Sequence, residues 1–160
     1  MGVLITDSKH GVYVSDLTGK ATQRIECGFS SPYMPCASPG HLLCACRAAR
    51  DCLCIHRGRA ESRLLLPALP ALAGMYISPC GRYLYQLSTE ADCLHTVHLG
   101  SGELCWAMPV GVFPRSLQMS RDGKQLLAAG GAVNHAVLYS APDLQPLSVI
   151  HTRHPCFAAA

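Results

Sequence analysis

Four cysteines in the second quarter of the chain have the residue type and spacing of a possible metal site. They form two Cys-x-Cys pairs, Cys44 with Cys46 and Cys52 with Cys54. Residues two apart on a β-strand share a face, so four thiolates on the two strands of one hairpin could hold a tetrahedral zinc ion. The spacing differs from the usual two-residue metal knuckle. We therefore favour buried packing thiols and predict no cofactor, with zinc as the alternative.

Polar side chains in the predicted turns are the second group of candidates. Carboxylates and imidazoles in turns can bind a ligand or serve as the general base of a hydrolase. Such residues also occupy ordinary solvated loops, so we favour binding over catalysis. For a hydrolase the candidate bases are Glu90, Asp92 and His154. The whole predicted binding rim comprises Asp7, His10, Arg50, Asp51, Glu90, Asp92, Arg115, Asn134 and His154.

Several classes of function lack a matching motif. The chain has no Gly-x-Ser-x-Gly nucleophile elbow, and its one Gly-Gly pair, Gly130-Gly131, falls in a predicted turn. The net charge is +3 and no run of four basic residues occurs, so nucleic acid is not an expected partner. The longest apolar stretch, residues 64–77, is interrupted by Pro67 and Pro70, and we predict no membrane span.

A repeat of about 41 residues organises these candidates. Pro32, Pro114 and Pro155 lie at multiples of 41 from one another, and Ala73 stands at the missing position. Related turns follow at residues 38–40, 78–81 and 120–123. A period of this length that contains several short strands is typical of a β-propeller blade. The sequence therefore predicts an all-β chain of about four blades, each a four-stranded antiparallel meander.

Alternating apolar residues place the strands within each repeat. After each turn we expect a strand, a polar turn, a second strand and then a last strand. The expected strands are 42–46, 52–56 and 63–66 in one repeat, 83–87, 93–97 and 104–108 in the next, and 125–129, 135–139 and 147–150 in the third. The polar turn of the first of these repeats is expected at 47–51, and the alignment matches Cys44 to Tyr85 and Leu127.

The opening repeat lacks its inner strand, because the alignment places Met1 opposite Tyr83. Residues 155–160 instead align with the inner strand 114–119. The expected blades are 1–28 with 154–160, 29–70, 71–111 and 112–153. Three arrangements are open: the last strand closes a four-bladed ring, two copies complete a larger ring, or the chain is part of a longer propeller.

The motifs resemble one known group of propellers. Residues 114–127, Pro-Arg-Ser-Leu-Gln-Met-Ser-Arg-Asp-Gly-Lys-Gln-Leu-Leu, are similar to the core repeat of the YVTN-type, lactonase-like propellers, and residues 78–85 repeat the pattern. The resemblance implies a propeller of six to eight blades. It also implies an activity drawn from sugar-lactone hydrolysis, redox-cofactor carriage or ligand binding, and it carries over no catalytic residue.

We thus expect a non-enzymatic binding or assembly module that acts on an unknown protein or small-molecule ligand. The alternative is a lactonase-like hydrolase acting on a sugar lactone. Ten cysteines at mostly apolar positions, with no secretory signal pattern, indicate reduced thiols and a bacterial cytoplasm. Sparse aromatic residues on the rim disfavour single-stranded nucleic acid as a ligand.

Overall fold

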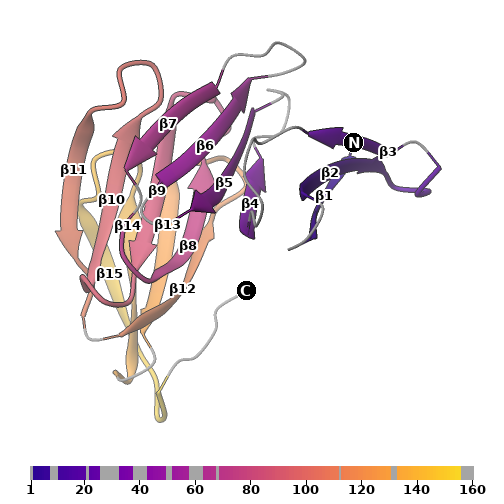
Figure 1. The fold of residues 1–160 in the computed structure, drawn as a ribbon. Coiled ribbons are helices and arrows are strands. Elements are labelled where there is room, and N and C mark those ends of the chain that lie inside the picture. Colours follow the sequence, from indigo (N-terminus) through magenta and orange to yellow (C-terminus); the bar gives the residue numbers. More distant parts are fainter. Residues whose placement is uncertain are drawn as a thin grey trace. The chain divides into compact units, whose positions relative to one another are not determined.

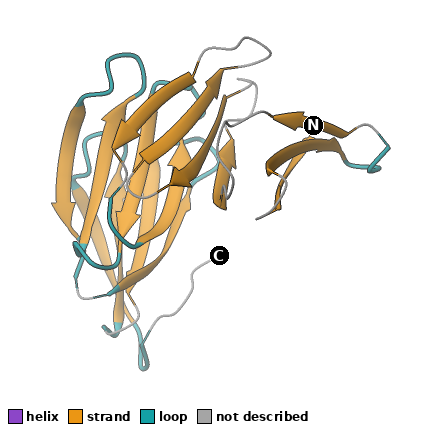
Figure 2. Cartoon of the chain, in the orientation of Figure 1, coloured by secondary structure: helices purple, strands orange, loops and turns teal. Residues whose placement is uncertain are grey.

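Strands make up the regular structure of the described chain (Figure 2). A computed structural model describes residues 2–7, 11–20, 22–25, 33–37, 43–49, 52–57, 63–67, 69–111, 113–130 and 133–155. None of these residues belongs to a helix that could cross a membrane. Contacts divide the chain into two units, Met1–Ala68 and Leu69–Ala160.

Each unit contains two antiparallel sheets, and every sheet joins strands that are consecutive in the sequence (Figure 1). The first sheet comprises β1 (Gly2–Asp7), β2 (Gly11–Asp16) and β3 (Thr22–Ile25). The second comprises β4 (Tyr33–Ala37), β5 (Leu43–Ala49), β6 (Cys52–Arg57) and β7 (Arg63–Pro67). The third comprises β8 (Leu72–Ile77), β9 (Tyr83–Ser88), β10 (Cys93–His98) and β11 (Leu104–Pro109). The fourth comprises β12 (Pro114–Met119), β13 (Gln125–Gly130), β14 (His135–Ser140) and β15 (Pro146–His151).

These meanders, four-stranded in the second, third and fourth sheets, confirm the predicted all-β fold and its strand order. The period between the third and fourth sheets is 42 rather than 41, because each strand of the fourth sheet begins 42 residues after its counterpart. The equivalent of Pro114 is therefore Leu72, and the prediction of Ala73 was off by one. Residues 156–160 lie outside the described residues and include all but the first residue of the predicted inner strand 155–160, so that strand and the blade boundaries stay predictions.

The hairpin of β5 and β6 corrects two details of the sequence alignment. β5 continues to Ala49, so the turn predicted at 47–51 is mostly strand. The pairing of β5 with β6 shifts register between Arg47 and Ala49, within the residues that were predicted to form the turn. Cys44 pairs with His56 as Leu84 pairs with Val97, which makes Leu84 rather than Tyr85 the equivalent of Cys44. One residue of offset moves a side chain to the other face of a strand, so the predicted match for Cys44 was wrong.

Within the first unit, a side chain fixes the turn from β2 to β3. The Asp16 carboxylate accepts hydrogen bonds from the backbone N–H groups of Thr18 (3.1 Å) and Lys20 (3.0 Å). At the base of the same hairpin the hydroxyls of Ser15 and Thr22 lie 3.2 Å apart. These contacts explain why Asp16 ends β2 and begins the turn to β3. β1 also contacts β4, which joins the first sheet to the second.

The core of the second unit lies between the third and fourth sheets. Residues that alternate along β9 and β10 point from the third sheet toward the fourth, and residues of β12, β13 and β14 meet them. The buried members of this interface cluster are Tyr85, Leu87, Leu94, Val110, Leu117, Leu126, Ala128, Tyr139 and Leu144. Trp106 and Met108 pack against the cluster. Burial of this apolar surface is the main force that holds the two sheets together.

Polar contacts align the two sheets where the cluster ends. The Tyr76 hydroxyl donates a hydrogen bond to Gln118 Oε1 (2.8 Å), and the Thr96 hydroxyl donates to the Pro142 carbonyl oxygen (3.1 Å). The strand that carries Tyr76, β8, also approaches β12 closely, because a Cβ on Gly74 would lie 2.9 Å from Leu117 Cβ. Tyr76 and Gln118 are 42 residues apart, so this hydrogen bond joins equivalent positions of two successive sheets.

Two tyrosines in the interface cluster should make the protein sensitive to alkali. Burial is the main cause that raises the pKa of Tyr85, with additional repulsion from Cys80, Tyr83 and Asp143, and burial likewise raises the pKa of Tyr139. The folded chain holds these phenol protons more tightly than the unfolded chain does. Their contribution to stability is therefore complete below about pH 10 and is lost as the pH rises further.

This sensitivity can be measured as the melting temperature (Tm) between neutral pH and about pH 11. We expect Tm of the natural chain to fall more steeply above about pH 10 than Tm of Tyr85→Phe, which has no phenol proton to lose. Parallel slopes for the two proteins would contradict a buried Tyr85 phenol.

Two equivalent turns differ in one side chain, which is a thiol in the third sheet and a carboxylate in the fourth. In the fourth sheet the Ser120 hydroxyl donates to Asp122 Oδ1 (2.7 Å), which also accepts from the Lys124 N–H (3.1 Å). In the third sheet Cys80 replaces the aspartate, and its Sγ lies 3.3 Å from Ser78 Oγ. Slight burial acts to raise the pKa of Cys80, but the Ser78 hydroxyl, the Arg82 N–H and the Arg82 charge together lower it below its ordinary value of 9.0. The turn thus favours an anion at this position.

We expect Cys80→Asp to stabilise the chain by about 0.5 kcal/mol, because a carboxylate accepts the turn's hydrogen bonds better than a thiol does. Chemical denaturation at neutral pH measures this change. The control is Cys80→Ala, which removes the acceptor and should not stabilise. Equal stabilities for the two variants would mean that the turn does not favour an anion.

Candidate functional site

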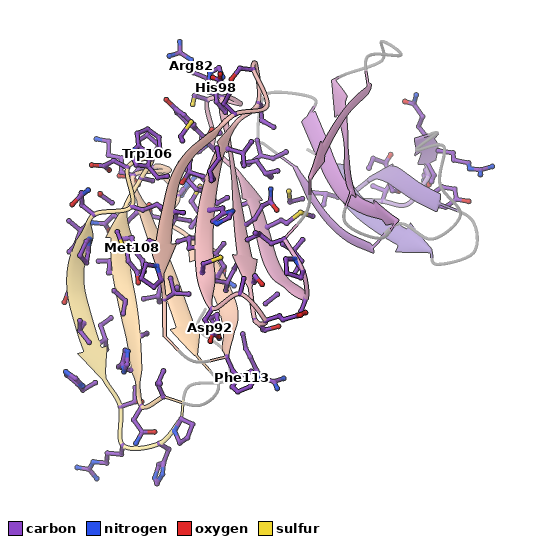
Figure 3. The ribbon with its side chains drawn as sticks, turned by 60° about the vertical axis from the view of Figure 1, so that its left-hand side comes forward. Arg82, Asp92, His98, Trp106, Met108 and Phe113 are labelled. Carbon is purple, nitrogen blue, oxygen red and sulfur yellow. The ribbon has the colours of Figure 1, made fainter. Side chains whose placement is uncertain are left out.

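One end of the third and fourth sheets gathers the turns that carry the predicted site residues. In a meander the turn after the second strand and the connection after the fourth lie at the same end. Hydrogen bonds confirm this for the third sheet: the N–H of Val110 donates to the Asp92 carbonyl (3.0 Å), and the N–H of Phe113 donates to Asp92 Oδ1 (2.8 Å). Figure 3 shows Asp92 and Phe113 side by side, with Arg82 and His98 at the opposite end of the sheet.

We call this end the Asp92 rim. It comprises the β9–β10 turn (residues 89–92), the β11–β12 connection (residues 110–113, of which Val112 is not described), the described part of the β13–β14 turn and residues 152–155 after β15. The neighbouring strand residues Arg115, His135 and His151 belong to it as well.

Phe113 is the most unusual residue of the Asp92 rim. Its φ is 54°, in the left-handed region that bulky side chains rarely adopt, and its ring is 55% exposed. Asp92, which holds the Phe113 N–H, has a φ of 49°. Backbone strain of this kind costs on the order of 1–3 kcal/mol and persists only where the surroundings impose it. The Asp92 carboxylate thus fixes the backbone that carries this exposed aromatic residue.

Two histidines lie next to this loop. The rings of His135 and His151, paired across β14 and β15, have centroids 6.2 Å apart. A Cβ on Gly111 would lie 3.9 Å from His135 Nε2, so the β11–β12 connection passes beside His135. Gly111 has a φ of 89°, which lets the chain turn there. The rim therefore combines an aromatic ring, a carboxylate and two imidazoles.

The other described residues of the predicted rim face solvent. Glu90, Arg115, Asn134 and His154 are exposed. The Asn134 carbonyl accepts from the Thr152 N–H (2.8 Å), and the Thr152 hydroxyl donates to the His154 carbonyl (2.6 Å). Backbone bonds thus fix the segment that carries His154.

The structure describes only part of the predicted nine-residue rim. Asp7 ends β1 in the first unit, and the placement of its side chain is not described. His10, Arg50 and Asp51 lie outside the described residues. Asp92 Oδ1 accepts a hydrogen bond from the Phe113 N–H, whereas Glu90 is an exposed neighbour in the same turn. The predicted hydrolase set of Glu90, Asp92 and His154 is divided between the third sheet and the segment after β15.

Burial shifts the pKa values of two further titratable groups, both on β10, the strand that follows Asp92. Burial raises the pKa of the Cys93 thiol, and the negative charge of Asp92 adds to this effect. On the same strand, burial lowers the pKa of His95. Burial and the Asp92 charge thus both disfavour the thiolate form of Cys93.

A metal site is not found among the described residues, where no group of three or more His, Cys, Asp or Glu side chains is suitably placed. The four cysteines of the sequence hypothesis fall on β5 and β6, whose side chains are not described. The register places Cys46 directly across from Cys54. Zinc at Cys44, Cys46, Cys52 and Cys54 stays a prediction.

Sequence reasoning missed the role of Phe113 and the pairing of His135 with His151. The residue before a proline is normally extended, so Phe113, which precedes Pro114, gave no sign of a left-handed backbone. The histidine pair could have been found from the repeat, because His135 begins β14 and His151 ends β15, and an antiparallel meander places these ends together.

Comparison with known proteins supports the fold. No family model and no curated protein matches the chain. Among solved structures, hydrazine synthase from Kuenenia stuttgartiensis matches with a TM-score of 0.69 and 17% identity, covering 79% of this chain and 38% of that one. The structure of apo AztD from Citrobacter koseri matches with a TM-score of 0.73 and 12% identity, covering 96% of this chain and 45% of that one.

The chain therefore spans less than half the length of either protein. Both are β-propeller-type structures, and at these identities the likeness concerns the fold alone. The successive four-stranded meanders, packed through a shared apolar interface, agree with that likeness. This chain has a β-propeller-type fold.

Proposed function

We propose that the chain is a binding module of the propeller type and that its ligand contacts the Asp92 rim. The observation that carries the proposal is Phe113, an exposed aromatic ring held in a left-handed backbone by the Asp92 carboxylate. A strained, exposed aromatic residue on a surface loop contributes nothing evident to the core. Such residues gather where a ligand is bound.

The chemistry of the rim suggests what the ligand offers. The exposed ring of Phe113 provides an apolar surface for a flat or branched apolar group. Arg115 and Glu90, both exposed, give the rim one charge of each sign, and His135 and His151 add polar groups. We infer a ligand that has an apolar group next to a polar or charged one, such as a protein segment or an amphipathic small molecule. The group of YVTN-type propellers that the sequence resembles includes such binding platforms.

The proposal can be tested by NMR titration of the ¹⁵N-labelled chain with N-acetyl dipeptide amides that carry Trp, Leu, Lys or Glu. We expect the Trp and Leu peptides to shift the amide signals of Asp92, Gly111 and Phe113, and to leave those of Arg82 and His98 at the opposite end unchanged (Figure 3). No change at the rim with any of the peptides would contradict this ligand class.

The decisive variant is Phe113→Gly. Glycine adopts a φ of 54° without strain, so the variant should be about 1 kcal/mol more stable than the natural chain. It should nevertheless bind the best peptide at least tenfold more weakly, because the ring is gone. The control is Leu104→Ala, which removes another exposed apolar side chain far from the rim and should leave affinity unchanged. Unchanged affinity in Phe113→Gly would refute the role of the ring.

The rival hypothesis, a lactonase-like hydrolase, makes a separate prediction. A panel of sugar lactones should be hydrolysed, and hydrolysis should be lost in Glu90→Gln, Asp92→Asn or His154→Ala. Asp92 Oδ1 already accepts the Phe113 N–H, which occupies one oxygen of the candidate base. We therefore favour binding, and lactone turnover that depends on these residues would reverse the choice.

A further inference from the structure

The two histidines of the Asp92 rim lie directly across from each other. His135 pairs with His151 where β14 begins and β15 ends. The next pair is joined by a hydrogen bond from the Thr152 N–H to the Asn134 carbonyl oxygen (2.8 Å). Hydrogen-bonded and non-hydrogen-bonded pairs alternate along antiparallel strands, so His135 and His151 form a non-hydrogen-bonded pair. The side chains of such a pair lie closest together, and both imidazoles project from the same face of the fourth sheet.

The repeat does not require histidine at these two positions. The equivalent pair is Cys52 with Pro67 in the second sheet and Cys93 with Pro109 in the third. Like the histidines, each pair joins the first residue of the sheet's third strand to the last residue of its fourth strand. A cysteine opposite a proline offers at most one metal ligand, because proline has no ligating side chain. The fourth sheet differs from these two sheets in presenting a pair of nitrogen ligands.

The spacing of the two rings suits a shared metal ion. Their centroids lie 6.2 Å apart. A metal–nitrogen bond is about 2.1 Å long, so two imidazoles that bind the same ion have ring centroids about 5–6 Å apart. His151 is exposed on the edge strand of the sheet, and a small rotation of its side chain covers the difference. Nε2 of His135 lies near Gly111, which has no side chain to block an approaching ion.

We propose that His135 and His151 together bind a divalent ion of copper, nickel or zinc. Imidazole nitrogen suits all three metals, and copper generally has the highest affinity for such a site. No group of three or more ligating side chains is suitably placed among the described residues, so the site has two protein ligands and water completes the coordination. The bound ion links the outermost strand, β15, to β14. This inference does not rest on the ligand proposed to contact Phe113, because the metal is bound by other side chains.

The test is an NMR titration of the ¹⁵N-labelled chain with Ni²⁺, which is paramagnetic and broadens the signals of nearby nuclei. The chain is kept reduced so that its cysteines do not form disulfides during the titration. We expect the imidazole signals of His135 and His151 to broaden together, at the same Ni²⁺ concentration. Because each residue has its own signal, Ni²⁺ that binds to cysteines elsewhere in the chain does not obscure this result. The Ni²⁺ concentration that halves the His135 signal measures the affinity of the site.

Two variants decide whether the histidines act as a pair. Loss of even an outer-shell partner commonly weakens metal binding about tenfold, so His151→Asn, which removes a ligand, should weaken Ni²⁺ binding at His135 by at least that factor. The matched control is His98→Asn, which removes a histidine at the opposite end of the third sheet and should leave the affinity unchanged (Figure 3). Circular dichroism should show intact strands in both variants.

Three results would overturn the proposal. The first is a His135 signal that broadens at the same Ni²⁺ concentration in His151→Asn as in the natural chain, because His135 would then bind the ion alone. The second is an equal loss of affinity in His98→Asn, which would mean that Ni²⁺ binds without selecting the pair. The third is the absence of broadening at both histidines even at a large excess of Ni²⁺ over the chain.

Discussion

Replacing Tyr85 with alanine is expected to lower the free energy of unfolding by about 3–5 kcal/mol. Tyr85 is 1% exposed and lies at the centre of the interface cluster, where it meets residues of the fourth sheet. Removal of its ring leaves a cavity between the third and fourth sheets. Each sheet forms only one wall of this cavity, so neither sheet can fill it by itself. Urea denaturation at neutral pH, monitored by circular dichroism, measures the change.

The control for Tyr85→Ala is Leu104→Ala. Leu104 is 54% exposed on the edge strand of the third sheet and should cost no more than about 0.5 kcal/mol. A loss below about 1 kcal/mol in Tyr85→Ala would show that the third and fourth sheets are not held together by this cluster.

Replacing Gly123 with alanine is expected to destabilise the chain by about 3 kcal/mol, from two causes. Gly123 has a φ of 70°, where any side chain costs about 1–2 kcal/mol. A Cβ at this position would also lie 2.3 Å from Pro79 Cδ, in the equivalent turn of the third sheet, and overpacking of this kind costs about 1–3 kcal/mol. Thermal and urea denaturation of the variant give the sum of the two.

Two further variants separate these causes. Gly19→Ala has a φ of 72° with nothing within 4 Å of the added Cβ, so it should cost only the backbone strain, about 1 kcal/mol. Adding Pro79→Ala to Gly123→Ala removes the clashing ring atoms and should recover about 1–2 kcal/mol relative to the sum of the single changes. Strictly additive effects would mean that the two turns do not touch.

The fold could be predicted from the sequence because each repeat contains recognisable turn residues and alternating apolar residues. Ser120, Asp122 and Gly123 fix one turn through their own hydrogen bonds and backbone angles, so their pattern reports local structure directly. The strands at 83–87, 93–97 and 125–129 were each placed within one residue at either end. The predicted period of about 41 matches the starts of β6 and β10 and of β7 and β11. It is one residue short between the third and fourth sheets, where the alanine and proline at 73 and 114 were counted instead of strand pairs.

The site was harder to predict because its geometry depends on contacts between separate turns. Asp92 was chosen as a polar turn residue, but its bond to the Phe113 N–H joins residues 21 apart in the sequence. A residue before a proline is normally extended, yet Phe113, whose N–H is held by the carboxylate, lies in the left-handed region. Equally, Cys44 pairs with His56, which sets β5 one residue away from the sequence alignment, and no count of sequence spacing shows this.

The most direct test of the packing of the third sheet on the fourth is a nuclear Overhauser measurement on the isotope-labelled chain. We expect cross-peaks from the Gly74 α-protons to a Leu117 methyl group and from the Gly123 α-protons to the ring protons of Pro79, because each pair is in contact. Absence of both cross-peaks from a spectrum that shows the strand pairing within each sheet would contradict the stacking of these sheets as successive propeller blades.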